Sequence, residues 1–478
     1  MQRGRSGGEI TTAERVVFAA GDLFGGGGAS IIAVLYLFFL TDIVGINPAL
    51  AGTAVLVAKL WDAVNDPLMG AISDRTRSRM GRRRPFILAG GLLLIGAMAV
   101  LWLPINPGQT QWQLAAWAAM SYVIYNTVAT MIAVPYASLS TEVTTDLDER
   151  NKANVLRLLF STVSSAGCTL LASQLFELYD AGTLTATGLS GWIVLGFGGF
   201  FTLAVLGVAL FTTERVPLPA THDRFSLRTF IAPLRFRPFR SLVGMYICQA
   251  LTMDVISAVL VYYSRYVVNV SPTVFLGVFI VVNLVAFGVI NRLVRTMSKH
   301  TLYRTGIPLG LIAVVAVALY PTGGPVWLVY VLAGLLATGL AGAQLMSWVI
   351  FPDVLDAAEL ETGQRNAGSY GGLMTFSRGL ATAVMIQVVG LVLGLTGYRP
   401  TADDVVVDQP DSAVTGIRLV LLISVVVLMT LAWFIARGFP LDRATIVAMQ
   451  DRLAARRAAP AADRPNRDPD ASTSTQHF

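Results

Sequence analysis

The sequence has few charged residues, and this scarcity argues against a soluble protein. Asp, Glu, Lys and Arg make up 13% of the 478 residues, whereas hydrophobic residues make up 54%, and the mean hydropathy is +0.64. Soluble domains contain about 25% charged residues. Many of the apolar runs approach or exceed the roughly 20 residues that a helix needs to cross a bilayer. The composition therefore predicts an all-α membrane protein with many spans.

Cysteine and histidine are also scarce, which removes several classes of chemistry. Cys168 and Cys248 both lie in apolar runs, so a disulfide framework is not expected. His222, His300 and His477 fall in predicted loops or in the tail. No metal-ligand spacing, nucleophile elbow or phosphate-binding motif is present. We therefore predict that the chain is not an enzyme and binds no cofactor other than a coupling ion.

Twelve membrane spans are predicted from the apolar runs. They lie near residues 16–44, 49–73, 86–105, 112–138, 153–178, 188–212, 240–268, 273–294, 305–321, 326–351, 369–397 and 413–438. Basic residues gather in alternate connections: residues 74–85 hold six arginines, whereas residues 45–48 and 322–325 hold no Lys or Arg. This positive-inside pattern predicts a multi-pass protein of the cell membrane with both termini in the cytoplasm. It also explains the net charge of +6 without nucleic acid as a partner.

The segment 213–239 divides the spans into two sets of six. Its four prolines argue against one long helix. The predicted organisation is a six-helix bundle over residues 1–212, a central cytoplasmic loop over 213–239, a second bundle over 240–438 and a cytoplasmic tail over 439–478. Acidic residues follow both span four and span ten. Because these spans are equivalent in a six-plus-six repeat, the recurrence suggests internal symmetry.

The second span carries the strongest candidate site. Asp62 and Asp66 are four residues apart, so both carboxylates lie on one helical face. Two close carboxylates repel, and one then holds a proton or both share a cation. Asn65 offers a further oxygen, which predicts a Na⁺ or H⁺ site. The alternative is that the acids pair with a base such as Lys59 only to hold helices together.

Two further charged residues lie within predicted spans, where they are costly and therefore functional candidates. Arg378 in span eleven needs a carboxylate or an anionic solute, because a guanidinium does not readily lose its charge. Asp62 and Asp66 are its expected partners, as a coupling pair or as a structural one. Asp254 in span seven has no partner visible in the sequence, and a cavity-lining role and a structural hydrogen bond are both open.

The arginine-rich connection after span two is a candidate conformational latch. Its residues are Gly70, Asp74, Arg75, Gly81 and Arg82. A carboxylate at the end of span two can bind arginines or a neighbouring helix N-terminus and so stabilise one conformation. The alternative is an ordinary solvated charged surface.

Several motifs, in order along nearly the whole chain, resemble one transporter family. They are Thr41-Asp42-Ile43-Val44-Gly45, Trp61-Asp62-Ala63-Val64-Asn65-Asp66-Pro67, Asp74-Arg75-Thr76-Arg77, Val134-Pro135-Tyr136, Tyr262-Tyr263 and Pro352-Asp353-Val354-Leu355-Asp356. The chain resembles the glycoside–pentoside–hexuronide:cation symporters of the major facilitator superfamily, which include the melibiose permease. The resemblance implies a major facilitator fold of 12 transmembrane helices in two six-helix bundles around a central cavity, working by alternating access.

The same resemblance assigns roles to individual residues. Asp62 and Asp66 match the family's cation-binding carboxylates, and Thr130 matches a hydroxyl of that site. Arg378 stands where the melibiose permease has a lysine near the site. Arg157 matches a basic residue of span five.

The positions that hold the sugar in the melibiose permease differ in this chain. Gly26 and Ala133 stand in place of its two sugar-binding acids. Ala137 and Gln344 stand in place of two tryptophans. A pocket that loses its hydrogen-bonding acids binds the same sugar far more weakly, so galactoside specificity is not expected. Tyr370 is among the aromatic residues that could stack on a sugar ring.

The sequence thus predicts a Na⁺- or H⁺-coupled symporter of a small organic solute, with a sugar or glycoside as the first candidate. The alternative is a transporter or exporter of an amphiphile such as a lysolipid or secondary metabolite, motivated by the apolar replacements in the pocket. A membrane sensor without transport is a third reading, although the short tail offers no folded sensor domain. The expected partners are the solute and membrane lipid, and the expected state is a monomer.

Overall fold

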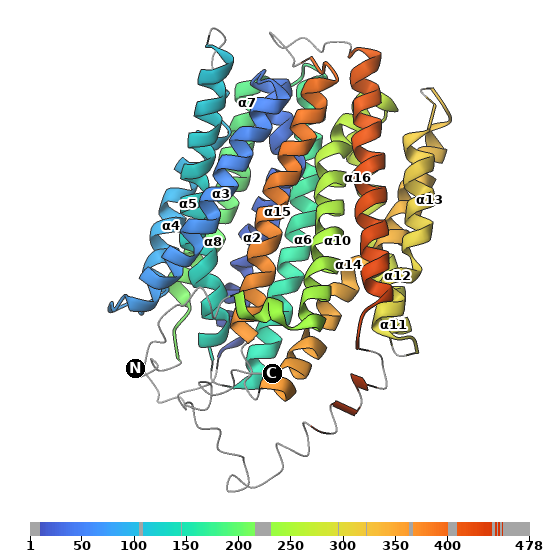
Figure 1. The fold of residues 1–478 in the computed structure, drawn as a ribbon. Helices are drawn as coiled ribbons and strands as arrows, with labels where there is room; N and C mark the ends of the chain where they lie inside the picture. The colour runs from blue at the N-terminus through green and yellow to red at the C-terminus, as the bar shows by residue number, and fades with distance from the viewer. Residues whose placement is uncertain are drawn as a thin grey trace, which may run out of the picture.

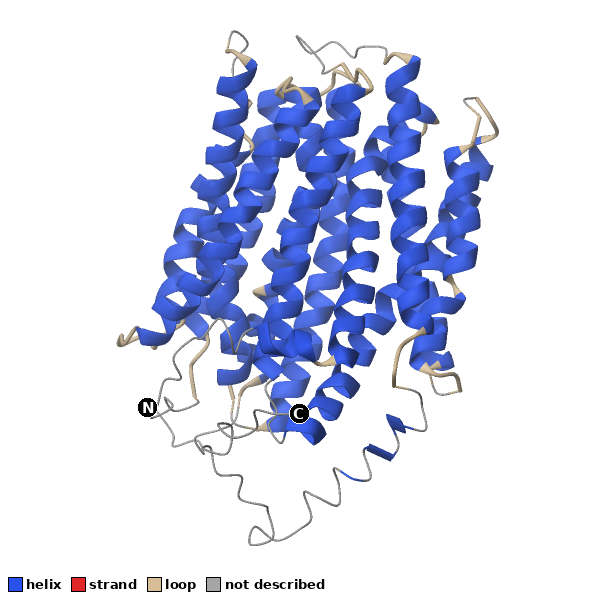
Figure 2. Cartoon of the chain, in the orientation of Figure 1, coloured by secondary structure: helices blue, strands red, loops and turns tan. Residues whose placement is uncertain are grey.

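The protein is seen in a computed structural model that describes most of the chain. The described residues are 10–104, 109–144, 146–215, 231–294, 296–321, 323–362, 367–399, 409–441, 445, 446, 448, 449 and 452. Throughout these ranges the regular elements are all helices, as Figure 2 shows. Most of the predicted central loop and cytoplasmic tail lies outside the described residues.

The helices form one long bundle with their axes roughly aligned (Figure 1). Those of the first half are α1 (Thr12–Ala20), α2 (Asp22–Ile31), α3 (Pro48–Arg75), α4 (Arg84–Leu101), α5 (Gln111–Glu142), α6 (Leu147–Asp180), α7 (Ala186–Gly191) and α8 (Gly199–Phe211). Those of the second half are α10 (Arg237–Tyr262), α11 (Pro272–Leu293), α12 (Lys299–Thr305), α13 (Ile307–Ala318), α14 (Val326–Thr362), α15 (Ala367–Leu395) and α16 (Asp411–Arg437). Short π-helical turns continue α2, α7 and α10.

Eleven segments of the described chain are long and apolar enough to cross a membrane. The predicted second span is the one missing from that set. Its helix α3 has 28 residues, which at about 1.5 Å per residue is long enough to cross. It falls short in hydropathy because Lys59, Asp62, Asn65 and Asp66 interrupt it. The span that is least apolar is therefore the one that carries the predicted cation site.

An internal repeat is visible where each half turns from its first span into its second. A π-helical turn occupies Phe39–Ile43 in the first half and Tyr263–Val267 in the second, 224 residues later. The same offset relates Gly45 to Asn269, which both have positive φ (77° and 52°). It also relates the helix-initiating Pro48 to Pro272, each preceded by a capping side chain. The internal symmetry predicted from the acidic segments is thus present in the backbone.

The two ends of α3 define the two ends of the bundle. We call the end at Arg75 the arginine-rich end and the opposite end, where α3 starts, the Asp42 end. The described residues nearest the chain termini lie toward the arginine-rich end (Figure 1). At the Asp42 end, α3 and α15 pack closely: a Cβ on Gly390 would lie 2.4 Å from the Pro48 carbonyl oxygen. Glycine permits this approach between the two halves of the molecule.

Candidate functional site

The predicted cation site lies between α3 and α5. The Lys59 Nζ lies 3.1 Å from Asp62 Oδ2, and Thr130 Oγ1 on α5 donates to Asp66 Oδ1 at 2.8 Å. Asp62 therefore has a cationic partner and Asp66 a neutral one. The structure brings together four residues that the sequence predicted for this site.

The site carries one excess negative charge and unused polar atoms. Lys59 offsets the negative charge of one of the two carboxylates. The hydroxyl of Thr130 is uncharged and does not offset the charge of the other. Asp62 Oδ1 is buried and has no hydrogen-bond partner among the described residues, and the same holds for Asn65 Nδ2. Asp66 is exposed. An exposed carboxylate beside an unused carboxylate oxygen is suited to a small hard cation or a proton.

Two hydrogen bonds fix α3 against α5 around this site. Asn126 Nδ2 donates to the backbone oxygen of Ala58 at 3.1 Å. The indole nitrogen of Trp61 donates to Thr127 Oγ1 at 2.9 Å. Both contacts precede the carboxylates along α3 and Thr130 along α5, so they hold the two helices together on one side of the site.

Arg378 has a different partner from the one predicted. Its Nη2 lies 3.1 Å from Oδ1 of Asp254 on α10, and Thr382 Oγ1 donates to the other carboxylate oxygen at 2.6 Å. The expected pairing with Asp62 or Asp66 is wrong, because α10 and α15 belong to the same half and place Asp254 within reach. Asp254, which had no partner visible in the sequence, therefore has two partners, Arg378 and Thr382.

A second arginine–aspartate pair lies in the first half. Arg157 Nε on α6 is 3.1 Å from Asp22 Oδ2 on α2, and the Arg157 guanidinium lies over the Tyr136 ring, with its carbon 5.6 Å from the ring centroid. Gly26, predicted to line the cavity, instead packs against α6: an added Cβ would lie 2.1 Å from the Ser161 carbonyl oxygen. Glycine is needed there for helix contact.

The other predicted cavity residues divide into two groups. Ala133 and Ala137 are exposed on α5, and their place in a solute cavity stays a prediction. Gln344 is partly buried, and its side-chain oxygen has no hydrogen-bond partner among the described residues. Tyr370 is buried against Phe239, with ring centroids 4.7 Å apart. The prediction that Tyr370 faces the solute is therefore wrong, because its ring belongs to the core of the second half.

A buried carboxylate joins the two halves at the Asp42 end. Asp42 is 1% exposed and accepts a hydrogen bond from the adjacent Thr41 hydroxyl at 2.6 Å. From the second half, the Tyr266 hydroxyl donates to it, and the Tyr398 hydroxyl lies 2.8 and 2.7 Å from its two oxygens. Asp42 and Tyr266 are equivalent positions of the 224-residue repeat. The contact therefore joins corresponding points of the two halves.

Two further polar contacts between the halves surround Asp42. Arg265 Nη2 lies 3.0 Å from Asp180 Oδ1. The carboxylate of Glu177 accepts from the Ser271 hydroxyl at 2.6 Å and from the Thr273 backbone N–H at 2.8 Å. We call these contacts, with those of Asp42, the Asp42 seal. No role was predicted for these contacts from the sequence, although an ionisable residue at the end of a span was a usable signal for Asp42.

The arginine-rich connection is latched within the first half. The Glu142 carboxylate, at the end of α5, binds Arg82 at 2.6 Å and Arg83 at 3.3 Å, and Arg83 also pairs with Asp74. Glu214 accepts backbone hydrogen bonds from residues 82–84. Of the predicted latch residues, Asp74 and Arg82 are thus ion-paired in this structure, and their role as a latch stays a prediction.

Arg83 and Glu214 are latch residues that the sequence analysis did not single out. Arg75 is exposed, and the acid beside it in the sequence pairs with Arg83 instead. Gly70 makes only ordinary contact with α5, since an added Cβ would lie 3.7 Å from Val134.

Gly81→Ala is expected to lower the thermal stability of the purified protein. Gly81 has a φ of +103°, and an added Cβ would lie 2.5 Å from the Glu214 carboxylate. Strained backbone of this kind costs about 1–3 kcal/mol. Gly96→Ala in α4 is the control, because nothing lies within 4 Å of its added Cβ. Thermal unfolding in detergent should separate the two variants, and equal shifts would contradict this account of the latch.

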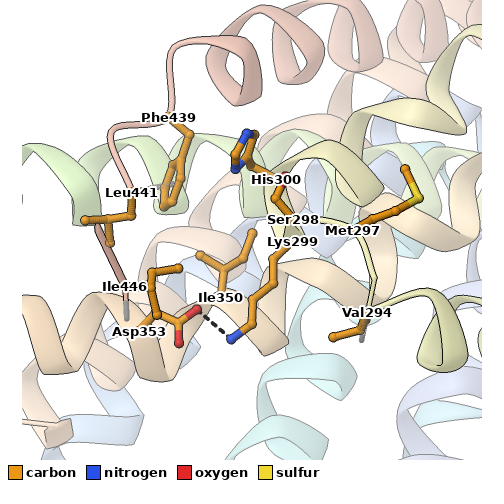
Figure 3. Close-up of a pocket in the computed structure, with 10 residues that line it drawn as sticks. All are labelled: Val294, Met297, Ser298, Lys299, His300, Ile350, Asp353, Phe439, Leu441 and Ile446. Atoms are coloured by element: carbon orange, nitrogen blue, oxygen red, sulfur yellow. Dashed lines mark hydrogen bonds and ion pairs between the residues drawn. The ribbon is translucent and has the colours of Figure 1, made fainter. Parts of the chain in front are cut away.

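The second half has a corresponding ion pair at the same end. Lys299 Nζ lies 2.6 Å from Asp353 Oδ2 near the end of α14, as Figure 3 shows. A pocket beside this pair is also lined by Phe439 and Leu441, which follow α16. Span ten thus ends on a paired acid, as span four does at Glu142, in agreement with the predicted symmetry.

Comparison with known proteins identifies relatives over nearly the whole chain. The sequence profile of a family described as "MFS/sugar transport protein" matches residues 17–443. An uncharacterized symporter, sll1374, of Synechocystis sp. (strain ATCC 27184 / PCC 6803 / Kazusa) is 26% identical, with 92% of this chain and 96% of the relative covered. A protein of Escherichia coli (strain K12) named "Putative glycoside/cation symporter YagG" is 25% identical, with 98% and 100% covered.

Solved structures share the fold. A bacterial homologue of the human lysosomal transporter Spinster, in an inward-facing and unoccupied conformation, superposes with a TM-score of 0.64 at 14% identity. The match covers 90% of this chain and 98% of that one. At this level of identity the likeness shows the architecture alone.

Proposed function

The chain belongs to the MFS/sugar transport protein family, among the glycoside–pentoside–hexuronide:cation symporters of the major facilitator superfamily, and from this membership we propose that it couples uptake of a sugar or glycoside to Na⁺ or H⁺. Members of this family are membrane transporters and not enzymes. The coupling cation binds at Asp62 and Asp66, with Thr130 as a further ligand. The two halves alternate in exposing this site to each side of the membrane.

The excess negative charge between α3 and α5 carries the proposal. Asp62 is the fifteenth of the 28 residues of α3, which places it about 21 Å along the helix and near the middle of the membrane. An uncompensated charge at this depth is costly. A bound cation or proton removes that cost, so the loaded site crosses between conformations more readily than the empty one.

The contacts between the halves support an inward-open state. The Asp42 seal closes one end of the molecule. At the arginine-rich end, the ion pairs of Arg82 and Lys299 each stay within one half. The excess of basic residues at that end indicates that it faces the cytoplasm, and the described residues nearest the two termini would then lie on the cytoplasmic side. The cation and the solute would leave from this state.

The amphiphile alternative is not favoured. The relatives are named as symporters, one of them of glycosides, and one of the apolar positions that motivated the alternative, Gly26, is used for helix packing. Ala133 and Ala137 remain consistent with either solute. The names of the relatives therefore support a sugar-type solute.

Transport by the purified protein in proteoliposomes tests the proposal. Entrance counterflow with a panel of pentoses, hexoses and their glycosides would first identify a solute. An inward Na⁺ or H⁺ gradient should then drive that solute above its equilibrium level. Counterflow without accumulation under either gradient would show a uniporter and overturn the proposed coupling.

A further inference from the structure

Each half holds one arginine–aspartate pair between its first and fifth spans. Arg157 pairs with Asp22 between α6 and α2, and Arg378 pairs with Asp254 between α15 and α10. Both pairs have a distance of 3.1 Å between nitrogen and oxygen. The arginine of the fifth span in each half therefore already has its charge matched by a carboxylate of the same half.

The two members of a pair differ in exposure. The Arg378 side chain is 42% exposed, whereas that of Asp254 is 12% exposed, and the Thr382 hydroxyl holds the second oxygen of Asp254. A guanidinium has five N–H donors, and the hydrogen bond from Arg378 Nη2 to Asp254 Oδ1 uses one of them. The carboxylate is thus held in place, while the arginine keeps donors for another acceptor.

This arrangement favours an uncharged solute. Sugar hydroxyl and ring oxygens accept hydrogen bonds from a guanidinium without needing its charge. A carboxylate on a solute bound to these arginines would add a negative charge beside Asp22 and Asp254, whose own charges already match those of the two arginines. Within the membrane, such a charge is costly unless it is paired. Lys59 offers no compensation, because Asp62 already pairs with it.

Resting on the symport function proposed above, we propose that the protein carries uncharged sugars or glycosides and rejects their uronate counterparts. Arg157 and Arg378 donate hydrogen bonds to the solute. Asp22 and Asp254 are positioning residues that neutralise these arginines and so set the selectivity against anions.

Matched sugar pairs test this selectivity. Glucose with glucuronate, and methyl β-glucoside with methyl β-glucuronide, differ only in a CH₂OH group against a carboxylate. In wild-type proteoliposomes, each sugar is tested as a competitor of the counterflow solute. The neutral member of a pair should inhibit at a concentration lower than that of the uronate by about tenfold or more. If the wild-type protein takes up a uronate at the same rate as its neutral partner, the inference is overturned, but the proposal of cation symport still holds. Failure of every solute under both gradients overturns the symport proposal instead.

Asp254→Asn tests the cause of the selectivity. It leaves Arg378 with an unmatched charge, so the preference for the neutral sugar should fall or reverse through a gain for the uronate. Asp254→Glu should keep the wild-type preference.

Asp353→Asn is the control, because it frees Lys299 at the arginine-rich end, away from the solute, and should not alter the preference. If Asp254→Asn does not reach the membrane, Asp22→Asn makes the same change beside Arg157. If the variant that reaches the membrane, Asp254→Asn or Asp22→Asn, keeps the wild-type preference, the inference is overturned.

Discussion

Asp66→Asn is expected to abolish cation-driven accumulation while leaving a folded protein. The substitution keeps the size of the side chain, and an asparagine oxygen can still accept from Thr130 Oγ1, which now lies 2.8 Å from the carboxylate. What it removes is the excess negative charge between α3 and α5. Without that charge the site no longer favours a cation, and we expect the apparent cation affinity to fall roughly 100-fold, at the upper end of typical coupling energies.

Solute accumulation against the Na⁺ or H⁺ gradient is the measurement. Thr130→Val should weaken cation affinity by a smaller factor, about tenfold, because it removes one uncharged hydroxyl from the site and leaves both carboxylates. Asp148→Asn is the control, since Asp148 is an exposed acid in the first turn of α6, and it should accumulate solute as the wild type does. Accumulation that persists in Asp66→Asn would exclude this carboxylate from coupling.

Asp42→Ala is expected to open the Asp42 end of the transporter. It leaves the hydroxyls of Tyr266 and Tyr398 without the acceptor that now joins them to the first half. Each buried polar group left unpaired costs about 1–3 kcal/mol, and a loss of 1.4 kcal/mol already changes a population about tenfold. The inward-open state should therefore lose population to the outward-open state.

Labelling of a cysteine from the Asp42 side would measure this shift. Ala133→Cys supplies an exposed reporter one turn from Thr130, in a background lacking the two buried native cysteines. A membrane-impermeant maleimide applied outside right-side-out vesicles should label it faster in Asp42→Ala.

Two tyrosine variants provide the matched comparison. Tyr398→Phe removes a hydroxyl that crosses between the halves, whereas Tyr320→Phe removes one that bonds the Pro325 carbonyl oxygen within the second half. Only the first should accelerate labelling. Equal labelling rates in the wild type and in Asp42→Ala would mean that the seal does not hold this state.

Most of the spans, and the grouping of polar residues on α3, could be predicted from local sequence. Apolar run length identified eleven of the twelve predicted spans among the described residues, because the bilayer imposes both the length and the helical form. Asp62 and Asp66 could be placed on one face because four residues are about one helical turn. The acids after spans four and ten indicated the repeat that the backbone carries. In each case the relevant interaction is local or is set by the bilayer.

The partners of charged residues in different spans could not be predicted in this way. Arg378 pairs with Asp254, 124 residues away, and Asp42 with Tyr398, 356 residues away. Nothing in the sequence distinguishes Asp254 from Asp62 as the partner of Arg378. The choice depends on which helices are neighbours and on how each is rotated about its axis.

The sequence alone thus determined that this chain crosses the membrane many times and carries a carboxylate pair within one span. Only the tertiary structure decided that the Asp42 end is sealed, that Arg378 is neutralised within its own half, and that Gly26 serves helix packing. The physical reason is that each successive helical residue turns by about 100°. A modest rotation of a whole helix exchanges one facing side chain for another, and packing among all the helices sets that rotation.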